Sequence, residues 1–275
     1  MPSKFTFKNM YFLLIVCLLF CFSACKTADV SKKITFADNV VVAHRGAWKA
    51  NVLPQNSIAS LKHAIELKCV GSEFDVRMTS DNILIVTHDA DFKGVDIETN
   101  TYAELSKQKL DNGETLPTFK QYLLAGMENN TSTGLVCEIK PSKIEGRGII
   151  IAENIVKLVK ELKAEPYILT YISFGYDILK KVKEIDPYAK TQYLDGSKTP
   201  DQLKQDGISG LDYLVYKLKI NPQWIESAKR QGLLLNAWTA NTTEDMDWLL
   251  ANDFDFITTD HPELLFERIK KKQNN

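Results

Sequence analysis

The sequence predicts a closed (β/α)8 barrel of the TIM type, and three observations support this prediction. Short β-branched runs alternate with longer segments of helical periodicity from residue 40 to the end of the chain, which is typical of βα units around a parallel sheet. Nine strands are expected, and one of them follows its predecessor after a turn too short for a parallel crossover. The eight that remain are the number of strands in such a barrel.

The expected strands are, in order, residues 40–43, 72–76, 83–86, 135–139, 167–171, 190–193, 212–215, 233–238 and 254–258. The turn over 79–82 is short, so the strand that follows it should return antiparallel to the strand before it. An open doubly wound sheet is the alternative architecture. No glycine-rich nucleotide-binding motif follows the first strand, however, and this favours the barrel.

Amphipathic segments between the strands are expected to form the outer helices. They are residues 57–67, 116–127, 149–162, 176–185, 222–230 and 243–250. The segment over 89–115 starts out polar and weakly periodic. We expect it to be an insertion over the barrel mouth, because loops of this length usually serve a function.

The N-terminus is expected to be a signal peptide over residues 1–24. Lys4 and Lys8 precede an apolar run over 11–22, which is shorter than the roughly 20 residues that a transmembrane helix needs. The run meets Ser23 and Ala24 and then Cys25, a context that resembles a bacterial lipobox.

Cys25 is therefore expected to be the lipid-modified first residue of the mature protein, with residues 25–38 as a tether and the barrel domain over 39–275. Phe22 departs from the usual small aliphatic residue at its position, so cleavage by signal peptidase I is the alternative. We expect an exported lipoprotein, anchored to a membrane on its periplasmic or cell-surface side.

Composition excludes an ordinary nucleic-acid-binding protein. Loss of the signal peptide leaves 32 basic and 35 acidic residues, a net charge of −3, so the chain lacks a basic footprint for nucleic acid. Cys69 and Cys137 would remain inside the domain, both in apolar stretches. They are expected to be small core residues, and a disulfide between them is the alternative.

The catalytic groups of a barrel come from the carboxyl ends of its strands. The first expected strand ends in His44, Arg45 and Gly46. This sequence places an acid/base group beside a fixed cation, and the glycine lets the backbone turn away sharply.

Two carboxylates follow on the second strand, where Glu73 and Asp75 project to the same side because side chains alternate along a strand. Such a pair is tolerable if a cation lies between the two, and oxygen ligands favour Mg²⁺ or Ca²⁺. The alternative is a solvated edge strand. The hairpin should bring His88 and Asp89 back to the same level.

Glu138 and Lys140 end the strand over 135–139. Glu138 is a candidate third metal ligand, and Lys140 either reaches a phosphate oxygen or forms a salt bridge with Glu138. The other two histidines are weaker candidates. His63 falls in a helical segment and is expected on its surface, and His261 falls in a turn at the end of the last strand.

The ordered set of these segments resembles the glycerophosphodiester phosphodiesterase family over nearly all of the mature chain. The matching segments are Ala43-His44-Arg45-Gly46, Pro54-Gln55-Asn56-Ser57, Glu73-Phe74-Asp75-Val76, Thr87-His88-Asp89, Glu138-Ile139-Lys140, Ile172-Ser173-Phe174, Ala237-Trp238-Thr239-Ala240-Asn241 and Ile257-Thr258-Thr259-Asp260.

The resemblance implies a distorted (β/α)8 barrel that hydrolyses small glycerophosphodiesters to sn-glycerol 3-phosphate and an alcohol, with one bound divalent cation. It implies the following roles: metal ligands Glu73, Asp75 and Glu138, phosphate ligands Arg45 and Lys140, acid/base residues His44 and His88, and glycerol contacts Phe174 and Trp238. Phe174 and Trp238 could equally be core aromatics.

Two departures from the family pattern affect substrate preference. Gln55 stands where a glutamate is usual, which keeps the shape but loses the charge, and residues 90–94 replace a segment rich in arginine and threonine. Metal binding should survive the first change, because that glutamate is not one of the family's three usual ligands.

Two other functions remain open. One is a lipid-cleaving phosphodiesterase of the same barrel, of the phospholipase D or lyase type, although the sequence shows no evident apolar loop for bilayer insertion. The other is a catalytically silent lipoprotein that binds glycerophosphodiesters, for which Gln55 is the support.

Overall fold

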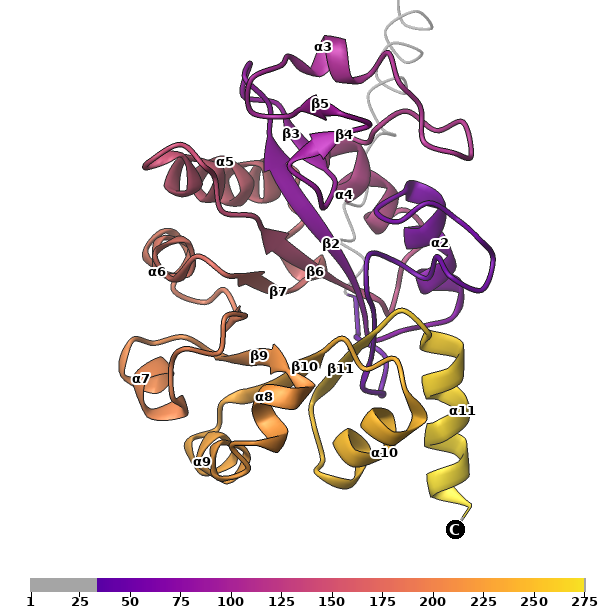
Figure 1. Cartoon of the computed structure of the whole chain (residues 1–275), viewed down its shortest axis with the longest axis vertical. Coiled ribbons are helices and arrows are strands. Elements are labelled where there is room, and N and C mark those ends of the chain that lie inside the picture. Colours follow the sequence, from indigo (N-terminus) through magenta and orange to yellow (C-terminus); the bar gives the residue numbers. More distant parts are fainter. Residues whose placement is uncertain (1–33, 275) are drawn as a thin grey trace, which may run out of the picture. The chain divides into compact units, whose positions relative to one another are not determined.

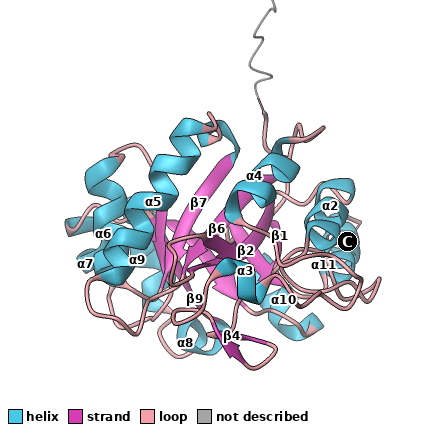
Figure 2. Ribbon diagram, turned by 90° about the horizontal axis from the view of Figure 1, so that it is seen from above, coloured by secondary structure: helices cyan, strands magenta, loops and turns pink. Residues whose placement is uncertain are grey.

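The computed structural model describes residues 34–274, which form a closed parallel barrel surrounded by helices (Figures 1 and 2). The barrel strands are β1 (Val41–Ala43), β2 (Gly71–Met78), β6 (Gly134–Ile139), β7 (Ile168–Ser173), β8 (Thr191–Tyr193), β9 (Gly210–Leu214), β10 (Leu234–Trp238) and β11 (Phe256–Thr259). Strand β1 pairs in parallel with both β11 and β2, which closes the barrel. The predicted (β/α)8 barrel is confirmed.

Strand β3 (Leu84–Val86) returns antiparallel to β2, with Val86 opposite Val76, as the short turn predicted. The segment after it is more regular than its sequence suggested. It contains strands β4 (Asp91–Phe92) and β5 (Val95–Asp96) and helix α3 (Tyr102–Leu105). Elements of two to four residues are too short to give a periodic signal.

The insertion contributes Phe92, Ile97 and Leu105 to a small apolar cluster, which Ile85 of β3 and Leu116 complete. It is attached beside β6, because the Glu98 carboxylate accepts a hydrogen bond of 3.2 Å from the backbone N–H of Lys143. None of the residues that line the pocket described below comes from it.

The outer helices are α2 (Ile58–Glu66), α4 (Phe119–Met127), α5 (Arg147–Glu161), α6 (Tyr176–Ile185), α7 (Pro200–Gln205), α8 (Val215–Lys219), α9 (Gln223–Gln231), α10 (Thr243–Ala251) and α11 (Pro262–Gln273). Two predicted strands include a residue that belongs to a neighbouring helical element. Tyr167 belongs to a 3₁₀ turn, η1 (Glu165–Tyr167), which has Pro166 in its first turn. Val215 begins α8, with its side chain buried.

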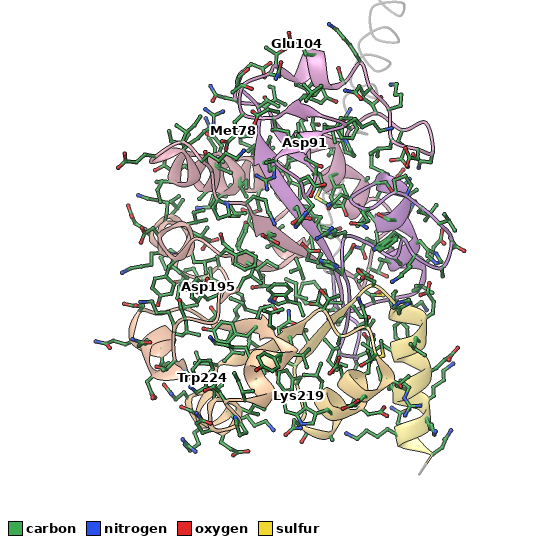
Figure 3. All side chains as sticks on the ribbon, viewed as in Figure 1. Met78, Asp91, Glu104, Asp195, Lys219 and Trp224 are labelled. Carbon is green, nitrogen blue, oxygen red and sulfur yellow. The ribbon has the colours of Figure 1, made fainter. Side chains whose placement is uncertain are left out.

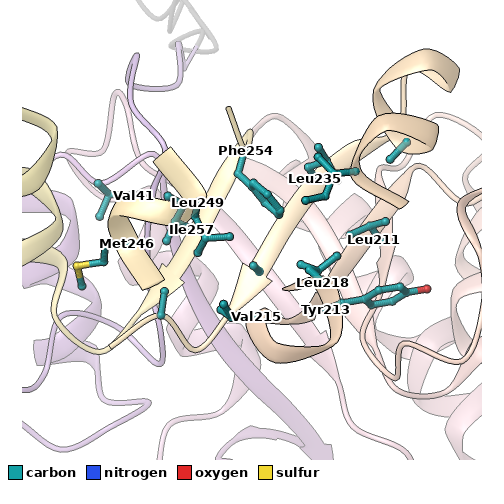
Figure 4. Close-up of a cluster of buried hydrophobic side chains, with 14 of the residues drawn as sticks. Val41, Leu211, Tyr213, Val215, Leu218, Leu235, Met246, Leu249, Phe254 and Ile257 are labelled. Carbon is teal, nitrogen blue, oxygen red and sulfur yellow. The ribbon is translucent and has the colours of Figure 1, made fainter. Parts of the chain in front are cut away.

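Side chains fill the space between the strands and the helices (Figure 3). On β9 the alternation is visible, because Leu211 and Tyr213 belong to the apolar cluster between strands and helices (Figure 4), whereas Asp212 lines a pocket inside the barrel. Cys69 and Cys137 are buried and free. The prediction that they are core residues is confirmed.

The first described residues lie at the amino-terminal ends of the barrel strands. Backbone N–H groups of Thr35 and Ala37 donate to the carbonyls of Thr131 and Ser132, just before β6. Phe36 packs against the apolar cluster inside the barrel. Residues 34–38, expected to be the end of a tether, therefore pack against the barrel.

The predicted signal peptide, Cys25 and the tether up to residue 33 lie outside the described residues. Within residues 34–274, no helix combines the length and the apolar character needed to cross a membrane.

Candidate active site

A pocket of about 120 Å³ lies at the carboxyl ends of the barrel strands. Eight of the nine predicted site residues of the barrel line it, together with four others: the full lining is His44, Arg45, Glu73, His88, Glu138, Lys140, Ile172, Phe174, Leu194, Asp212, Trp238 and Thr258. The ninth, Asp75, lies next to this set on β2. The barrel topology thus brings together side chains that are far apart in the sequence.

Three buried carboxylates converge at one side of the pocket. Glu73 and Asp75 share the inward side of β2, and Glu138 is paired with Asp75 in the parallel register of β2 and β6. One oxygen of each lies within 4.8 Å of the others. The predicted convergence is therefore observed.

Electrostatics within this group are uneven. Burial and the neighbouring carboxylates Asp75 and Glu138 raise the pKa of Glu73 well above its ordinary value. Burial and Asp75 raise the pKa of Glu138 to about 8, although Lys140 opposes this. Burial alone would raise the pKa of Asp75, but Lys140, His88 and Arg45 outweigh it and hold that pKa at about 2.

The carboxylates fit a divalent cation. Oε1 of Glu73 is buried and has no hydrogen-bond partner, and a donor set made only of carboxylate oxygens suits a hard cation. A cation here would relieve the repulsion that raises the pKa values of Glu73 and Glu138. The cluster therefore fits the divalent cation that the sequence predicted.

Lys140 forms ion pairs with two of the three carboxylates. Its Nζ lies 2.7 Å from Oε1 of Glu138 and 3.2 Å from Oδ1 of Asp75. Of the two predicted alternatives for Lys140, the salt bridge is therefore the contact present, and the same ammonium also lines the pocket.

Arg45 is held in a left-handed backbone conformation with φ of 57°. Its backbone N–H donates to Oε2 of Glu73 at 2.8 Å, and its Nη1 donates to Oε1 of Gln55 at 2.6 Å. The turn requires Gly46, because a Cβ there would lie 2.4 Å from Oγ of Ser60. Gln55 thus orients the guanidinium without carrying a charge.

Asn56 is a residue whose role the sequence did not reveal. Its Nδ2 donates to Oδ2 of Asp75 at 2.8 Å, and its Oδ1 accepts the backbone N–H of Asp75 at 3.1 Å. This double contact fixes the carboxylate of Asp75. The sequence singled out the segment Pro54–Ser57, but nothing in its spacing indicated that Asn56 contacts Asp75.

His44 is held by a second unassigned residue, Asp260. Nδ1 of His44 lies 2.7 Å from Oδ1 of Asp260, and Asn241 donates to the other oxygen of Asp260 at 2.7 Å. Burial opposes ionisation of Asp260, but the hydrogen bond from His44 outweighs it and lowers the pKa of Asp260 to about 2.

His88 faces the same pocket from the hairpin. Its Nδ1 lies 2.8 Å from Oδ1 of Asp89, and Nε of Arg77 donates to its carbonyl at 2.8 Å. Burial lowers the pKa of His88, against the opposing attraction of Asp75. The carboxylates of Asp75 and Asp89 favour the protonated imidazole, which is the form that can donate a proton.

Aromatic rings form one wall of the pocket. Phe174 and Trp238 meet edge to face with ring centroids 5.6 Å apart, and Nζ of Lys140 lies 5.9 Å from the Phe174 ring centroid. Nε1 of Trp238 donates to the carbonyl of Asp212 at 2.9 Å. Both rings are therefore placed to contact a bound ligand.

Asp212 is the most deeply buried acidic residue of the pocket lining, and no sequence signal singled it out. Oδ1 of its side chain is buried without a hydrogen-bond partner, and burial together with Glu138 raises its pKa well above the ordinary value. By contrast, His63 and His261 do not line the pocket. His63 contacts Glu263 of α11 at 3.2 Å, and His261 precedes the first turn of that helix.

Comparison with known proteins gives consistent matches. Residues 44–264 match the family model described as the glycerophosphoryl diester phosphodiesterase family. A glycerophosphodiester phosphodiesterase of Caldanaerobacter subterraneus is 32% identical, with 84% of this chain and 98% of that protein covered.

Solved structures match the fold. A glycerophosphodiester phosphodiesterase from Parabacteroides distasonis has a TM-score of 0.83 and 37% identity, with 87% of this chain and 100% of that chain covered. An Oleispira antarctica phosphodiesterase in complex with the product sn-glycerol-3-phosphate has a TM-score of 0.70 and 21% identity, with 84% and 97% covered. At that identity the second match supports the fold alone.

Proposed function

The chain belongs to the glycerophosphoryl diester phosphodiesterase family, and from this premise we propose that it hydrolyses glycerophosphodiesters to sn-glycerol 3-phosphate and an alcohol. It is an enzyme, a phosphoric diester hydrolase. The observation that carries the proposal is that two carboxylates, two cations and two histidines line one pocket, and that a third carboxylate, Asp75, converges with the first two.

Glu73, Asp75 and Glu138 would hold one divalent cation. Each offers a carboxylate oxygen, and oxygen ligands favour Mg²⁺ or Ca²⁺. When bound, the cation supplies positive charge to the non-bridging oxygens of the phosphodiester. Arg45 and Lys140 add to this charge from the protein, and such electrostatic stabilisation is commonly worth several kcal/mol.

The two histidines divide the proton transfers. The Asp260 carboxylate accepts the Nδ1 proton of His44, which leaves Nε2 free to remove a proton from the nucleophile, either water or the glycerol 2-hydroxyl. His88 protonates the departing alkoxide. It comes from the hairpin, where it is more exposed than His44, so a variable alcohol can leave past it.

A lipid-cleaving function remains the second candidate because of one observation. Contrary to the sequence reading, apolar side chains are exposed beside the mouth: Leu214, Tyr216 and Ile220, on and next to α8, are 46%, 72% and 54% exposed. Exposed apolar side chains of this kind suit a membrane surface.

Turnover of glycerophosphocholine, with and without EDTA, tests the proposal. We expect metal-dependent release of choline and sn-glycerol 3-phosphate, and little release of choline from phosphatidylcholine vesicles. The reverse preference would support the lipid-cleaving candidate. Binding without turnover of either substrate would support a silent binding lipoprotein and contradict the proposal.

We also propose that the mature protein begins at a lipidated Cys25 and is anchored to a membrane after export. The apolar run and the lipobox-like segment support this. Labelled palmitate should enter the parent protein and not Cys25→Ser. An unlabelled parent that is released free of membranes would contradict it.

A further inference from the structure

Four polar side chains lie inside the barrel on consecutive strands, β8 to β11. Each is at most 2% exposed, and they are Gln192, Asp212, Asn236 and Thr258. Asp212 and Thr258 line the pocket themselves. Gln192 and Asn236 stand two residues before Leu194 and Trp238, which line it, so they point to the same side of their strands.

Several atoms of these side chains have no hydrogen-bond partner in the protein. They are Oδ1 of Asp212, Oε1 and Nε2 of Gln192, and Nδ2 of Asn236. Oδ1 of Asn236 is satisfied, since it accepts from Oγ1 of Thr258 at 3.2 Å. Native proteins leave few buried polar atoms unpaired, so a group of them below one pocket indicates a polar ligand.

The chemistry of the free atoms selects the ligand. A carboxyl group, two amide N–H₂ groups and an amide oxygen offer both acceptors and donors. Hydroxyl groups, which donate and accept at the same oxygen, complement this set. A phosphate is a poor match, because it would face the carboxyl group of Asp212.

Size and surroundings point to a small polyol. The pocket volume of about 120 Å³ is well below the roughly 300–1,000 Å³ of pockets for drug-sized ligands. Trp238 stands beside Asp212, to whose carbonyl it donates, and it can cover the carbons of a small ligand. The cationic residues Arg45 and Lys140 provide for the phosphate within the same pocket.

We propose that Asp212, assisted by Gln192 and Asn236, binds the hydroxyl groups of the glycerol moiety. The glycerol end of the diester then enters the pocket first, and the variable alcohol remains at the mouth. This inference rests on the proposed function, and it assigns glycerol specificity to polar side chains of β8, β9 and β10, which are separate from the metal and phosphate ligands.

The test compares two substrates on the holoenzyme with Mg²⁺ or Ca²⁺ present. Glycerophosphocholine carries glycerol hydroxyls, and bis(p-nitrophenyl) phosphate does not. In Asp212→Asn and Asp212→Leu, the ratio of kcat/KM for glycerophosphocholine to that for the aryl diester should fall about 10- to 100-fold, the usual effect of leaving buried hydrogen-bonding groups without their partner.

Thr191→Val is the matched control. Oγ1 of Thr191 is also buried without a partner, but Thr191 neighbours Gln192 on β8 and so points away from the pocket. Its variant should keep the parental ratio. A second measurement is inhibition by sn-glycerol 3-phosphate and by methyl phosphate, where the Asp212 variants should lose the parent's preference for sn-glycerol 3-phosphate.

The Asp212 variants should also melt at or above the parental temperature, because they remove an unpartnered buried carboxyl group. Folded Asp212 variants that keep both the parental ratio and the parental inhibitor preference would overturn the inference while the proposed function stands. A parent that cleaves the aryl diester but not glycerophosphocholine would instead overturn the proposed function, and the inference with it.

Discussion

His44 and His88 face the same pocket, but the segments that hold them differ. The side chains of His44 and its partner Asp260 are 19% and 16% exposed, and Asn241 fixes the far oxygen of Asp260. The side chains of His88 and Asp89 are 39% and 77% exposed. The imidazole of His44 is therefore fixed by its partners, whereas that of His88 is accessible to solvent and to a departing alcohol.

The difference matches the roles proposed for the two histidines, because the two proton transfers would have different structural needs. A general base that must approach its nucleophile in one orientation is more effective when its tautomer and ring position are fixed. An acid that must serve variable leaving groups gains from access. The following predictions separate the two sides of the pocket, in order of decreasing effect.

The largest expected effect is common to both sides. Glu138→Ala removes one of three carboxylates, so Mg²⁺ or Ca²⁺ binding and turnover should both be lost. Calorimetry measures the first and choline release the second, with Glu226→Ala on the exposed surface of α9 as a control. Cation binding as tight as in the parent would show that the assigned ligands are wrong.

Replacing each histidine by alanine should lower turnover of glycerophosphocholine by roughly 10²- to 10⁴-fold while the metal stays bound. The rates of the two variants should differ on a p-nitrophenyl phosphodiester, because its leaving group needs little protonation. His88→Ala should be largely rescued and His44→Ala should not. Rescue of His44→Ala alone would exchange the two roles, and near-parental rates for both would contradict the mechanism.

The partners of the histidines should differ in importance. Asp260→Asn should lower kcat by roughly 10²-fold or more, because the amide no longer fixes the tautomer of His44. Asp89→Asn should change kcat by less than about threefold, since exposed ion pairs contribute little. Steady-state kinetics with both variants test this, and equal losses would remove the distinction between the two sides.

The smallest expected effect is on stability in acid. The pKa of Asp260 is lowered to about 2 in the folded protein, against about 3.9 in an unfolded chain. Its contribution, about 1–2 kcal/mol, is therefore present at neutral pH and is lost as the pH falls from about 5 towards 2. Urea unfolding of the parent across this range should show a steeper loss than that of Asp260→Asn.

Much of the fold could be predicted because local signals agree with the topology. Alternating β-branched and amphipathic segments give the barrel, and the short turn before β3 gives the antiparallel arm. Val215 was assigned to the strand because a β-branched residue after an apolar strand looks like its continuation. In the structure it is the first residue of α8, and its side chain is buried.

The candidate site could be predicted in part for the same reason. In a barrel the strand ends must meet, so eight predicted residues line one pocket. Their partners could not be predicted, since contacts such as that between His44 and Asp260 join residues 216 positions apart. Asp212 was missed because the role of a single acidic residue within an apolar strand cannot be inferred until the residues around it are known.

The entry of the chain beneath the barrel affects how the protein can be handled. Thr35 and Ala37 are hydrogen-bonded next to the amino-terminal end of β6, and Phe36 packs against the apolar cluster inside the barrel. The pocket lies at the carboxyl ends of the same strands. If the protein is immobilised through a residue before Ile34, the attachment point lies at the amino-terminal ends of the strands. The pocket at their carboxyl ends then stays accessible to substrate in solution.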